Sequence, residues 1–136
     1  MKLTKYILFL IVPFTVLFSC TKEESDKVLS DQFSDNTWTI SYYFDEKDET
    51  SNFTGYVFEF QNTGILKASK GGTSTTGSWI IDNNSSKLTI NFPGATNYLE
   101  NLNDDWLLID RTNEIIKLKD DKTTSEGEIL HFTRKL

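Results

Sequence analysis

From Trp38 onward, apolar residues recur at every second position along most of this 136-residue chain. In the segment NTWTISYYF, the apolar face would comprise Trp38, Ile40, Tyr42 and Phe44, and the opposite face would comprise Thr39, Ser41 and Tyr43. Successive side chains of a β-strand point to opposite faces, so this alternation is typical of a strand with one buried face. The pattern therefore restricts the chain to a fold built from half-buried strands.

Seven further segments of strand character follow, separated by turn residues such as QNTG, KGG and DNNSS. They are GYVFEFQ, ILKASK, TSTTGSWII, KLTINF, WLLID, EIIKLK and EILHFTRK. Only residues 28–33 and the segment TNYLENL have helical spacing, and both are too short for a parallel crossover. The sequence thus predicts an all-β fold, an eight-stranded antiparallel up-and-down meander closed into a barrel. An open β-sandwich is the alternative.

The N-terminal segment has the pattern of a secretory leader. Lys2 and Lys5 precede thirteen residues, 6–18, that carry no charged side chain. A membrane-spanning helix needs about 20 apolar residues, so this shorter run fits a signal peptide better than a transmembrane helix. Residues 1–19 are therefore predicted to be a signal peptide, and the lone cysteine of the chain, Cys20, follows it directly.

The residues before Cys20 resemble the lipobox of bacterial lipoprotein precursors, with Leu17 three places and Ser19 one place ahead of the cysteine. The resemblance implies that Cys20 is acylated, with palmitate as an expected acyl chain, and becomes the mature N-terminus. Two or more acyl chains give stable membrane anchoring, at about 0.8 kcal/mol per buried methylene. A secreted protein whose leader happens to end near a cysteine is the alternative.

The segment that follows Cys20 consists of charged and small polar residues. Residues 20–33 are expected to form the lipidated cysteine and a flexible linker, and residues 34–136 the single folded domain. The run Lys22-Glu23-Glu24 resembles the acidic export signal of some Gram-negative lipoproteins. This resemblance implies an outer membrane lipoprotein exposed at the cell surface, with retention on the periplasmic side as the alternative.

The charge of the predicted mature chain excludes two classes of partner. Without Lys2 and Lys5, 12 of the 14 basic side chains remain against 20 acidic ones, a net charge of about −8. Nucleic-acid binding needs a basic footprint for the phosphates. Peripheral binding to anionic lipid needs basic clusters as well. The membrane is therefore expected as a partner only through the anchor on Cys20.

A series of short motifs runs through residues 34–136. Trp38 stands near the start of the first predicted strand, the acidic segment FDEKDETSNF precedes an aromatic second strand, and KGG, TGSW, DDW and IKLKD follow. The last strand contains Leu130, Phe132 and Arg134. In these motifs the chain resembles the lipocalin-like domains of small Gram-negative bacterial lipoproteins. The resemblance implies a lipocalin-like barrel in which Arg134 covers Trp38 at one end.

Aromatic residues on the predicted inner face are the candidate ligand-binding residues. An eight-stranded barrel either fills its interior with such rings or lines a pocket with them. The predicted lining residues are Tyr42, Phe58, Trp79 and Phe92. The expected function is binding of a small apolar molecule in the barrel. The alternative is a non-enzymatic protein–protein interaction or adhesion accessory module that uses the outer strands and an acidic rim.

The sequence predicts no enzymatic activity, catalytic residue, cofactor or metal. His131, the one histidine, alternates with Phe132 and is expected on the solvated face. One histidine and one cysteine are too few ligands for a transition-metal site. Acidic residues gather at Asp104–Asp105 and in residues 45–49, but the latter segment lacks the glycine and the regular ligand spacing of a dedicated calcium loop. Both groups are expected to form a solvated acidic rim.

Overall fold

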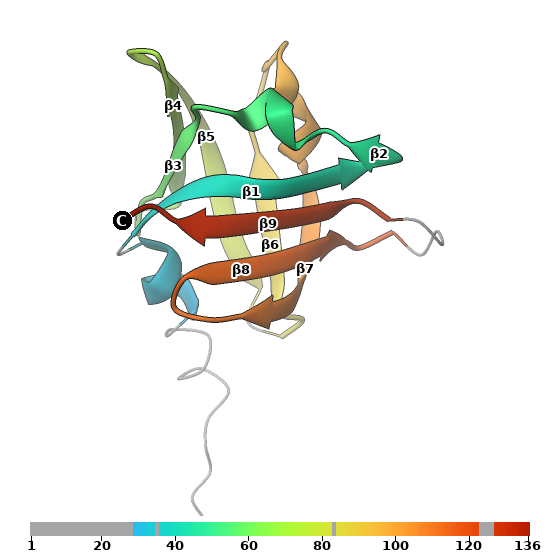
Figure 1. Cartoon of the computed structure of the whole chain (residues 1–136). Helices are drawn as coiled ribbons and strands as arrows, with labels where there is room; N and C mark the ends of the chain where they lie inside the picture. The colour runs from blue at the N-terminus through green and yellow to red at the C-terminus, as the bar shows by residue number, and fades with distance from the viewer. Residues whose placement is uncertain (1–28, 35, 83, 123–126) are drawn as a thin grey trace, which may run out of the picture.

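The computed structural model describes residues 29–136 except 35, 83 and 123–126 (Figure 1), so Cys20 and the predicted leader lie outside the described residues. Residues 29–34 form a short helix, and two 3-10 helices, η1 (Thr50–Phe53) and η2 (Tyr98–Leu102), interrupt the strands. The strands are β1 (Thr37–Asp45), β2 (Lys47–Asp48), β3 (Val57–Phe60), β4 (Ile65–Lys70), β5 (Thr73–Asp82), β6 (Lys87–Asn91), β7 (Asp104–Arg111), β8 (Ile115–Asp120) and β9 (Ile129–Arg134). In the described part of the chain, no helix has the length and apolar character needed to cross a membrane.

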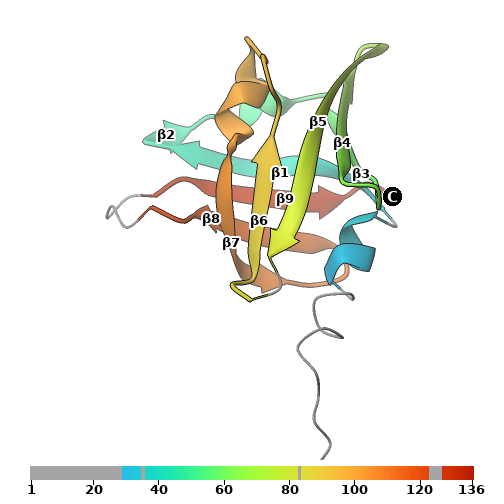
Figure 2. The same cartoon turned by 180° about the vertical axis from the view of Figure 1, so that it is seen from behind.

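The strands form one closed antiparallel barrel. Each strand from β3 to β8 pairs with the next along the chain, β1 pairs with β3, and six residue pairs between β1 and β9 close the sheet. β2 is a two-residue strand folded back on the end of β1, so eight strands make up the wall. Figures 1 and 2 show β1, β9 and β8 crossing the direction of β5, β6 and β7 on the opposite wall. The predicted eight-stranded up-and-down barrel is confirmed, and the β1–β9 pairing excludes the open sandwich.

The turn between β4 and β5 shows how local chemistry sets the meander. Lys70 pairs with Thr73, which leaves Gly71 and Gly72 as a two-residue loop. Both glycines have positive φ, 59° and 81°. Tight hairpins of this kind require positive φ at their central positions, a conformation that glycine adopts without steric cost. The KGG motif is therefore a hairpin turn, as the sequence predicts.

A β-bulge in β1 changes which residues of this strand face the interior. The register with β9 shifts between Ile40 and Tyr42, so Ser41 has no partner of its own. An extra residue in one strand reverses the alternation beyond it. Tyr43 is therefore completely buried, whereas Tyr42 is half-buried on the outer surface. The prediction that Tyr42 and Phe44 face the interior is wrong, because simple alternation assumes an unbroken strand.

Large aromatic side chains fill the barrel interior. The ring centroid of Phe132 lies 5.6 Å from that of Phe58 and 5.4 Å from that of Phe60, and both pairs are nearly perpendicular. Edge-to-face packing of this kind is favourable between aromatic rings. The other side chains in this core with no more than 1% exposure include Trp38, Tyr43, Leu66, Phe92, Trp106, Ile116, Leu118 and Leu130.

Residues 29–34 cover one end of the barrel. Phe33 inserts its ring at centroid distances of 4.7 Å from Phe60 and 5.8 Å from Trp79. The Trp38 indole Nε1 donates a hydrogen bond to the Phe33 carbonyl oxygen at 3.0 Å. Leu29 is also buried, because residues four apart lie on the same face of a helix. Leu29 and Phe33 of the predicted linker therefore belong to the core, and the helical turn expected in this segment is present.

The two 3-10 helices cover the other end. η1 contributes Phe53, whose ring centroid lies 5.0 Å from that of Tyr43. η2 contributes the buried side chains of Leu99 and Leu102, and the Trp106 indole Nε1 donates to the Leu102 carbonyl oxygen at 3.0 Å. The helical turn predicted in TNYLENL is η2. With both ends covered, the aromatic interior is closed off from solvent.

Arg134 lies directly opposite Trp38 in the β1–β9 register, as the lipocalin resemblance implies. The stacking of its guanidinium on the indole is not found. Within the described residues, the cation–π contact present is that of Lys70, whose Nζ lies 4.9 Å from the Tyr56 ring centroid. Phe33 packs against Trp38 instead, so the helix replaces arginine as the cover of this end.

Candidate functional site

The four predicted pocket residues do not form one pocket. Phe58 and Phe92 are fully buried, and Trp79 is 7% exposed. Tyr42 lies outside the barrel, beyond the bulge. No ring contact joins any two of these four residues in the described structure, because each packs against other neighbours. The inner three are core residues.

Two surface depressions lie at the end of the barrel covered by residues 29–34. One, of about 220 Å³, is lined by Ser30, Asn62, Gly64, Trp79, Ile80 and Ile81. The other, of about 410 Å³, is lined largely by polar residues around Asn36 and Lys135. The Trp79 indole Nε1 donates to the Gln61 carbonyl oxygen at 2.8 Å, so the ring presents little of its surface to the first depression. Pockets for drug-sized ligands occupy roughly 300–1,000 Å³, so this depression has room for only a small group.

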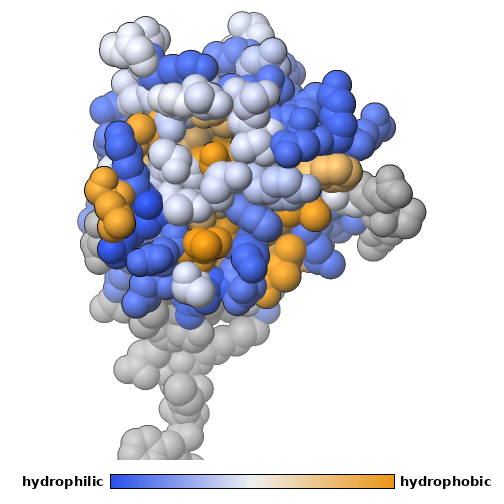
Figure 3. All heavy atoms as spheres, in the orientation of Figure 1, coloured by the Kyte–Doolittle hydropathy of each residue, from blue (hydrophilic) through white to orange (hydrophobic). Residues whose placement is uncertain are grey.

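A second feature is an aromatic patch on the outer wall of the barrel, which we call the outer aromatic face and define as Tyr42, Phe44, Ile129 and His131. Tyr42 pairs with His131 in register, and Phe44 pairs with Ile129. The Tyr42 ring centroid lies 5.2 Å from that of His131 and 6.5 Å from that of Phe44. All four side chains are half-buried, and Figure 3 shows apolar atoms exposed among polar ones on this side of the molecule.

His131 has no catalytic partner in the described residues. Its ring contacts Tyr42, and no carboxylate or hydroxyl is hydrogen-bonded to it there. Burial, followed by the neighbouring positive charge of Lys117, lowers the pKa of the imidazole. Both effects favour a neutral ring at neutral pH, which suits a position within an apolar patch.

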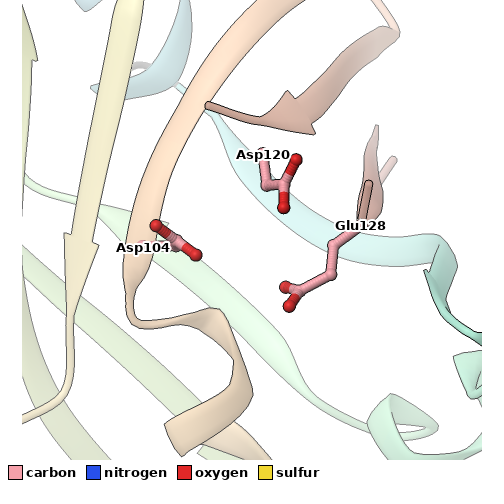
Figure 4. A group of neighbouring side chains, drawn as sticks. All are labelled: Asp104, Asp120 and Glu128. Atoms are coloured by element: carbon pink, nitrogen blue, oxygen red, sulfur yellow. The ribbon is translucent and has the colours of Figure 1, made fainter. Parts of the chain in front are cut away.

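Three carboxylates converge at the end of the barrel covered by η2. Asp104 begins β7, Asp120 ends β8, and Glu128 immediately precedes β9. One carboxylate oxygen of each lies within 4.8 Å of one oxygen of each of the other two. Figure 4 shows the three side chains directed toward a common centre. We call these residues the carboxylate cluster.

The strand register explains how the carboxylate cluster forms. Asp120 pairs with Trp106 of β7, and the backbone N–H of Asp120 donates to the Glu128 carbonyl oxygen at 3.0 Å. Asp104 precedes Trp106 by two residues and therefore shares its inward face. Glu128 shares the inward face of Leu130 for the same reason. The end of the barrel thus continues the apolar interior with a layer of acidic side chains.

Among the described residues, three neighbours make polar contacts with the carboxylate cluster. The backbone N–H of Asp105 donates to Asp104 Oδ1 at 2.8 Å. The Lys122 ammonium forms an ion pair with Asp104. The Tyr43 hydroxyl lies 3.4 Å from Glu128 Oε2 and 3.3 Å from the Asn101 carbonyl oxygen, so it can donate to either. Burial, and next the charge of Glu128, raise the pKa of Tyr43, so this hydroxyl remains a neutral donor.

Burial and neighbouring charges also shift the pKa values of Glu128 and Lys122. Burial raises the pKa of Glu128, and the nearby carboxylate of Asp45 raises it further. The hydrogen bond to Asp104 is the main cause that raises the pKa of Lys122. Three carboxyl groups thus share one ammonium, and repulsion between them is balanced only in part.

Asp120 differs from the other two members because it is almost fully buried, at 5% exposure. In the described residues its carboxylate makes no hydrogen bond, and no cation lies within ion-pair distance of it. A buried carboxylate without such partners is energetically unfavourable. Gly127 packs against it so closely that a Cβ at position 127 would lie 2.4 Å from Asp120 Oδ1. Among the described residues, therefore, no side chain neutralises Asp120.

The other predicted acidic residues have surface partners. Asp48 Oδ1 accepts a hydrogen bond from the Thr50 backbone N–H at 2.9 Å, and the hydrogen bonds from Thr50 lower the pKa of Asp48. Asp105, next to Asp104, accepts from the Thr89 hydroxyl at 2.6 Å and lies 3.6 Å from Lys87 Nζ. These residues form the polar rim that the sequence predicts. Asp104, in contrast, turns inward.

Sequence reasoning missed the carboxylate cluster, although the chain contains the signal for it. Asp104, Asp120 and Glu128 each stand two residues from a buried residue of their own strand, namely Trp106, Leu118 and Leu130. Extending the alternation to the strand ends would have placed all three inside. Asp104 was instead assigned to a solvated rim, and Asp120 and Glu128 were not considered as acidic site residues.

No family model and no curated protein matches the chain. Among solved structures, the barrel is similar to a protein of the DUF4847 family from Bacteroides vulgatus ATCC 8482. The two share 14% sequence identity with a TM-score of 0.58, and the match covers 77% of this chain and 96% of the other. At this level of identity the similarity supports the barrel fold alone.

Proposed function

We propose that this chain is a lipid-anchored, non-enzymatic binding module of the bacterial envelope that acts through its outer surface. The observation that favours the outer surface is the packed interior, in which Phe132 contacts Phe58 and Phe60 and helical segments cover both ends. Such packing leaves the predicted lining residues in the core. Of the two functions expected from the sequence, interaction with a protein partner is therefore the better supported.

The outer aromatic face is the surface best suited to a protein partner. Tyrosine and other aromatic residues are enriched at the centres of protein interfaces, where charged residues are depleted. A Tyr–Phe pair with its rings 6.5 Å apart offers such a centre. Around it, Thr133 donates to the Ser41 hydroxyl at 2.8 Å, and Lys117 pairs with Asp110, which supplies a polar rim.

Binding of a small apolar molecule is the second candidate. The depression beside Trp79, Ile80 and Ile81 is the observation that favours it, because two isoleucine side chains and an indole give it an apolar lining. An entering ligand would have to displace Phe33 to reach the interior, since this ring lies against both Trp79 and Phe60. This function therefore requires a movement of residues 29–34.

Cross-linking in cells separates these two functions. With p-benzoylphenylalanine at position 42 of the full chain, we expect a discrete protein adduct that weakens when Phe44→Ala is added. The matched control places the same group at position 109, because Ile109 is 53% exposed and lies outside the outer aromatic face. No excess of adduct from position 42 over position 109, together with saturable quenching of Trp79 fluorescence by fatty acids, would favour the ligand function.

The lipid anchor has its own test. Cys20→Ala is expected to abolish incorporation of radiolabelled palmitate and to leave the unprocessed precursor, because acylation requires the thiol and precedes cleavage in the lipoproteins that the leader resembles. The sequence predicts a linker between Cys20 and the folded domain, so the barrel is expected to remain folded. Absence of label in the wild-type chain would show that Cys20 is not acylated.

A further inference from the structure

The carboxylate cluster has the composition of a cation site rather than of a solvated rim. We propose that Asp104, Asp120 and Glu128 bind a calcium ion. Their side chains come from three successive strand ends, and their oxygens approach within 4.8 Å of one another. Asp120 is 95% buried in this arrangement, points toward the common centre in Figure 4 and has no partner among the described residues. A bound cation would supply the partner that the described residues do not.

The charge of the cluster matches a divalent ion. Three ionised carboxylates and the Lys122 ammonium, which pairs with Asp104, leave two negative charges in excess. The nearby carboxylate of Asp45 adds to this negative charge. At close range and partial burial, repulsion between carboxylates is costly. One divalent cation would offset the two excess charges of the cluster, and the described residues offer no further lysine or arginine ion pair to it.

The donor atoms favour calcium over other divalent ions. All are oxygens, since no histidine or cysteine belongs to the cluster, and hard oxygen donors suit calcium and magnesium rather than zinc or copper. The Asn101 carbonyl oxygen adjoins the cluster through the Tyr43 hydroxyl. Calcium accepts six to eight oxygens in irregular geometry and takes waters at the remaining positions, whereas magnesium demands a near-ideal octahedron. Three carboxylates on separate strand ends fit the irregular coordination of calcium better than the octahedron of magnesium.

Lys122 would compete with the ion for Asp104. Its side chain is 59% exposed, so the ammonium can move into solvent when a cation arrives. Removing this positive charge is therefore expected to strengthen calcium binding, the opposite of what removal of a ligand does. Lys117 provides a matched control, because it pairs with Asp110 on the outer wall at the far ends of the same two strands.

Calorimetric titration of the full chain with calcium chloride, after removal of bound metal by a chelator, tests the proposal. We expect one site with a dissociation constant of roughly 0.1–1 mM, the range of extracellular calcium modules. Asp120→Asn and Glu128→Gln should each weaken binding by about tenfold or more, because each removes one charged ligand. Asp110→Asn, which removes a charge from the other end of β7, should leave it unchanged. Lys122→Gln should tighten binding several-fold more than Lys117→Gln.

Absence of calcium binding to the wild-type chain, or equal weakening by Asp110→Asn and Asp120→Asn, would overturn the proposal. Magnesium binding of equal strength would overturn the assignment to calcium. Circular dichroism shows whether each variant is folded. If Asp120→Asn does not fold, the more exposed Glu128→Gln decides the matter, since its side chain lies closer to solvent.

Discussion

Phe132→Ala is expected to lower the free energy of unfolding by about 3–5 kcal/mol, the usual cost of truncating a buried phenylalanine. Phe132 is completely buried and makes edge-to-face contacts with Phe58 and Phe60. Its removal would leave a cavity beside these two rings of β3, which their contacts with Tyr56 and Trp79 hold in place. The loss is measured by urea unfolding of the full chain, followed by far-ultraviolet circular dichroism.

Phe44→Ala is the matched control for this prediction. Phe44 is half-buried on the outer aromatic face and contacts Tyr42, so its truncation should cost less than about 1 kcal/mol. The comparison also bears on function. A packed interior makes the two costs very different, whereas a hollow barrel would give Phe132 little to contact. Similar costs for the two variants would therefore contradict the packed interior and favour a ligand cavity.

Most of the barrel could be predicted from the sequence because, in a half-buried strand, the alternation of apolar and polar residues indicates which side chains face the core. Trp38, Phe58 and Leu118 each stand in an alternating segment, and each is buried as expected. Closure could be predicted from the strand number, since short turns such as Gly71–Gly72 permit only neighbouring antiparallel pairs. The fold thus follows from local patterns that all point to the same arrangement.

The bulge in β1 could not be predicted in this way. The segment contains three consecutive aromatic residues, Tyr42, Tyr43 and Phe44, so either register would bury an aromatic side chain. The selection of Tyr43 depends on contacts far along the chain, namely its hydrogen bonds near Asn101 and Glu128 and its ring contact with Trp106. Alternation within one strand contains no information about these distant partners.

The carboxylate cluster lies between these two cases. The inward orientation of each member could be predicted, because each one stands two residues from a buried residue of the same alternating segment. That the three side chains come together could not be predicted, because it depends on the β7–β8 and β8–β9 registers, which bring Asp120 beside Trp106 and Glu128. A site assembled from three strand ends is visible only when the strands are paired.

Gly77→Ala is expected to destabilise the protein by about 1–3 kcal/mol or more, the range for overpacking a well-packed core. Gly77 lies in β5 opposite the buried Leu66. A Cβ at this position would lie 2.4 Å from the backbone oxygen of Asn91 and 2.7 Å from Phe92 Cδ1. Because the first of these atoms belongs to the backbone of β6, no rotation of a side chain can relieve the contact.

Ser78→Ala is the matched control for Gly77→Ala, because Ser78 is the next residue of β5 and is exposed. Its substitution should change the free energy of unfolding by less than about 0.5 kcal/mol in the same urea experiment. Comparing the two variants shows whether the space beside Gly77 is tightly filled. In the structure the Phe92 ring occupies it, so an added methyl group must push apart β5 and β6. If Gly77→Ala were as mild as Ser78→Ala, β5 and β6 would be able to move apart at this point, and the interior beside Trp79 could admit a small apolar molecule after all.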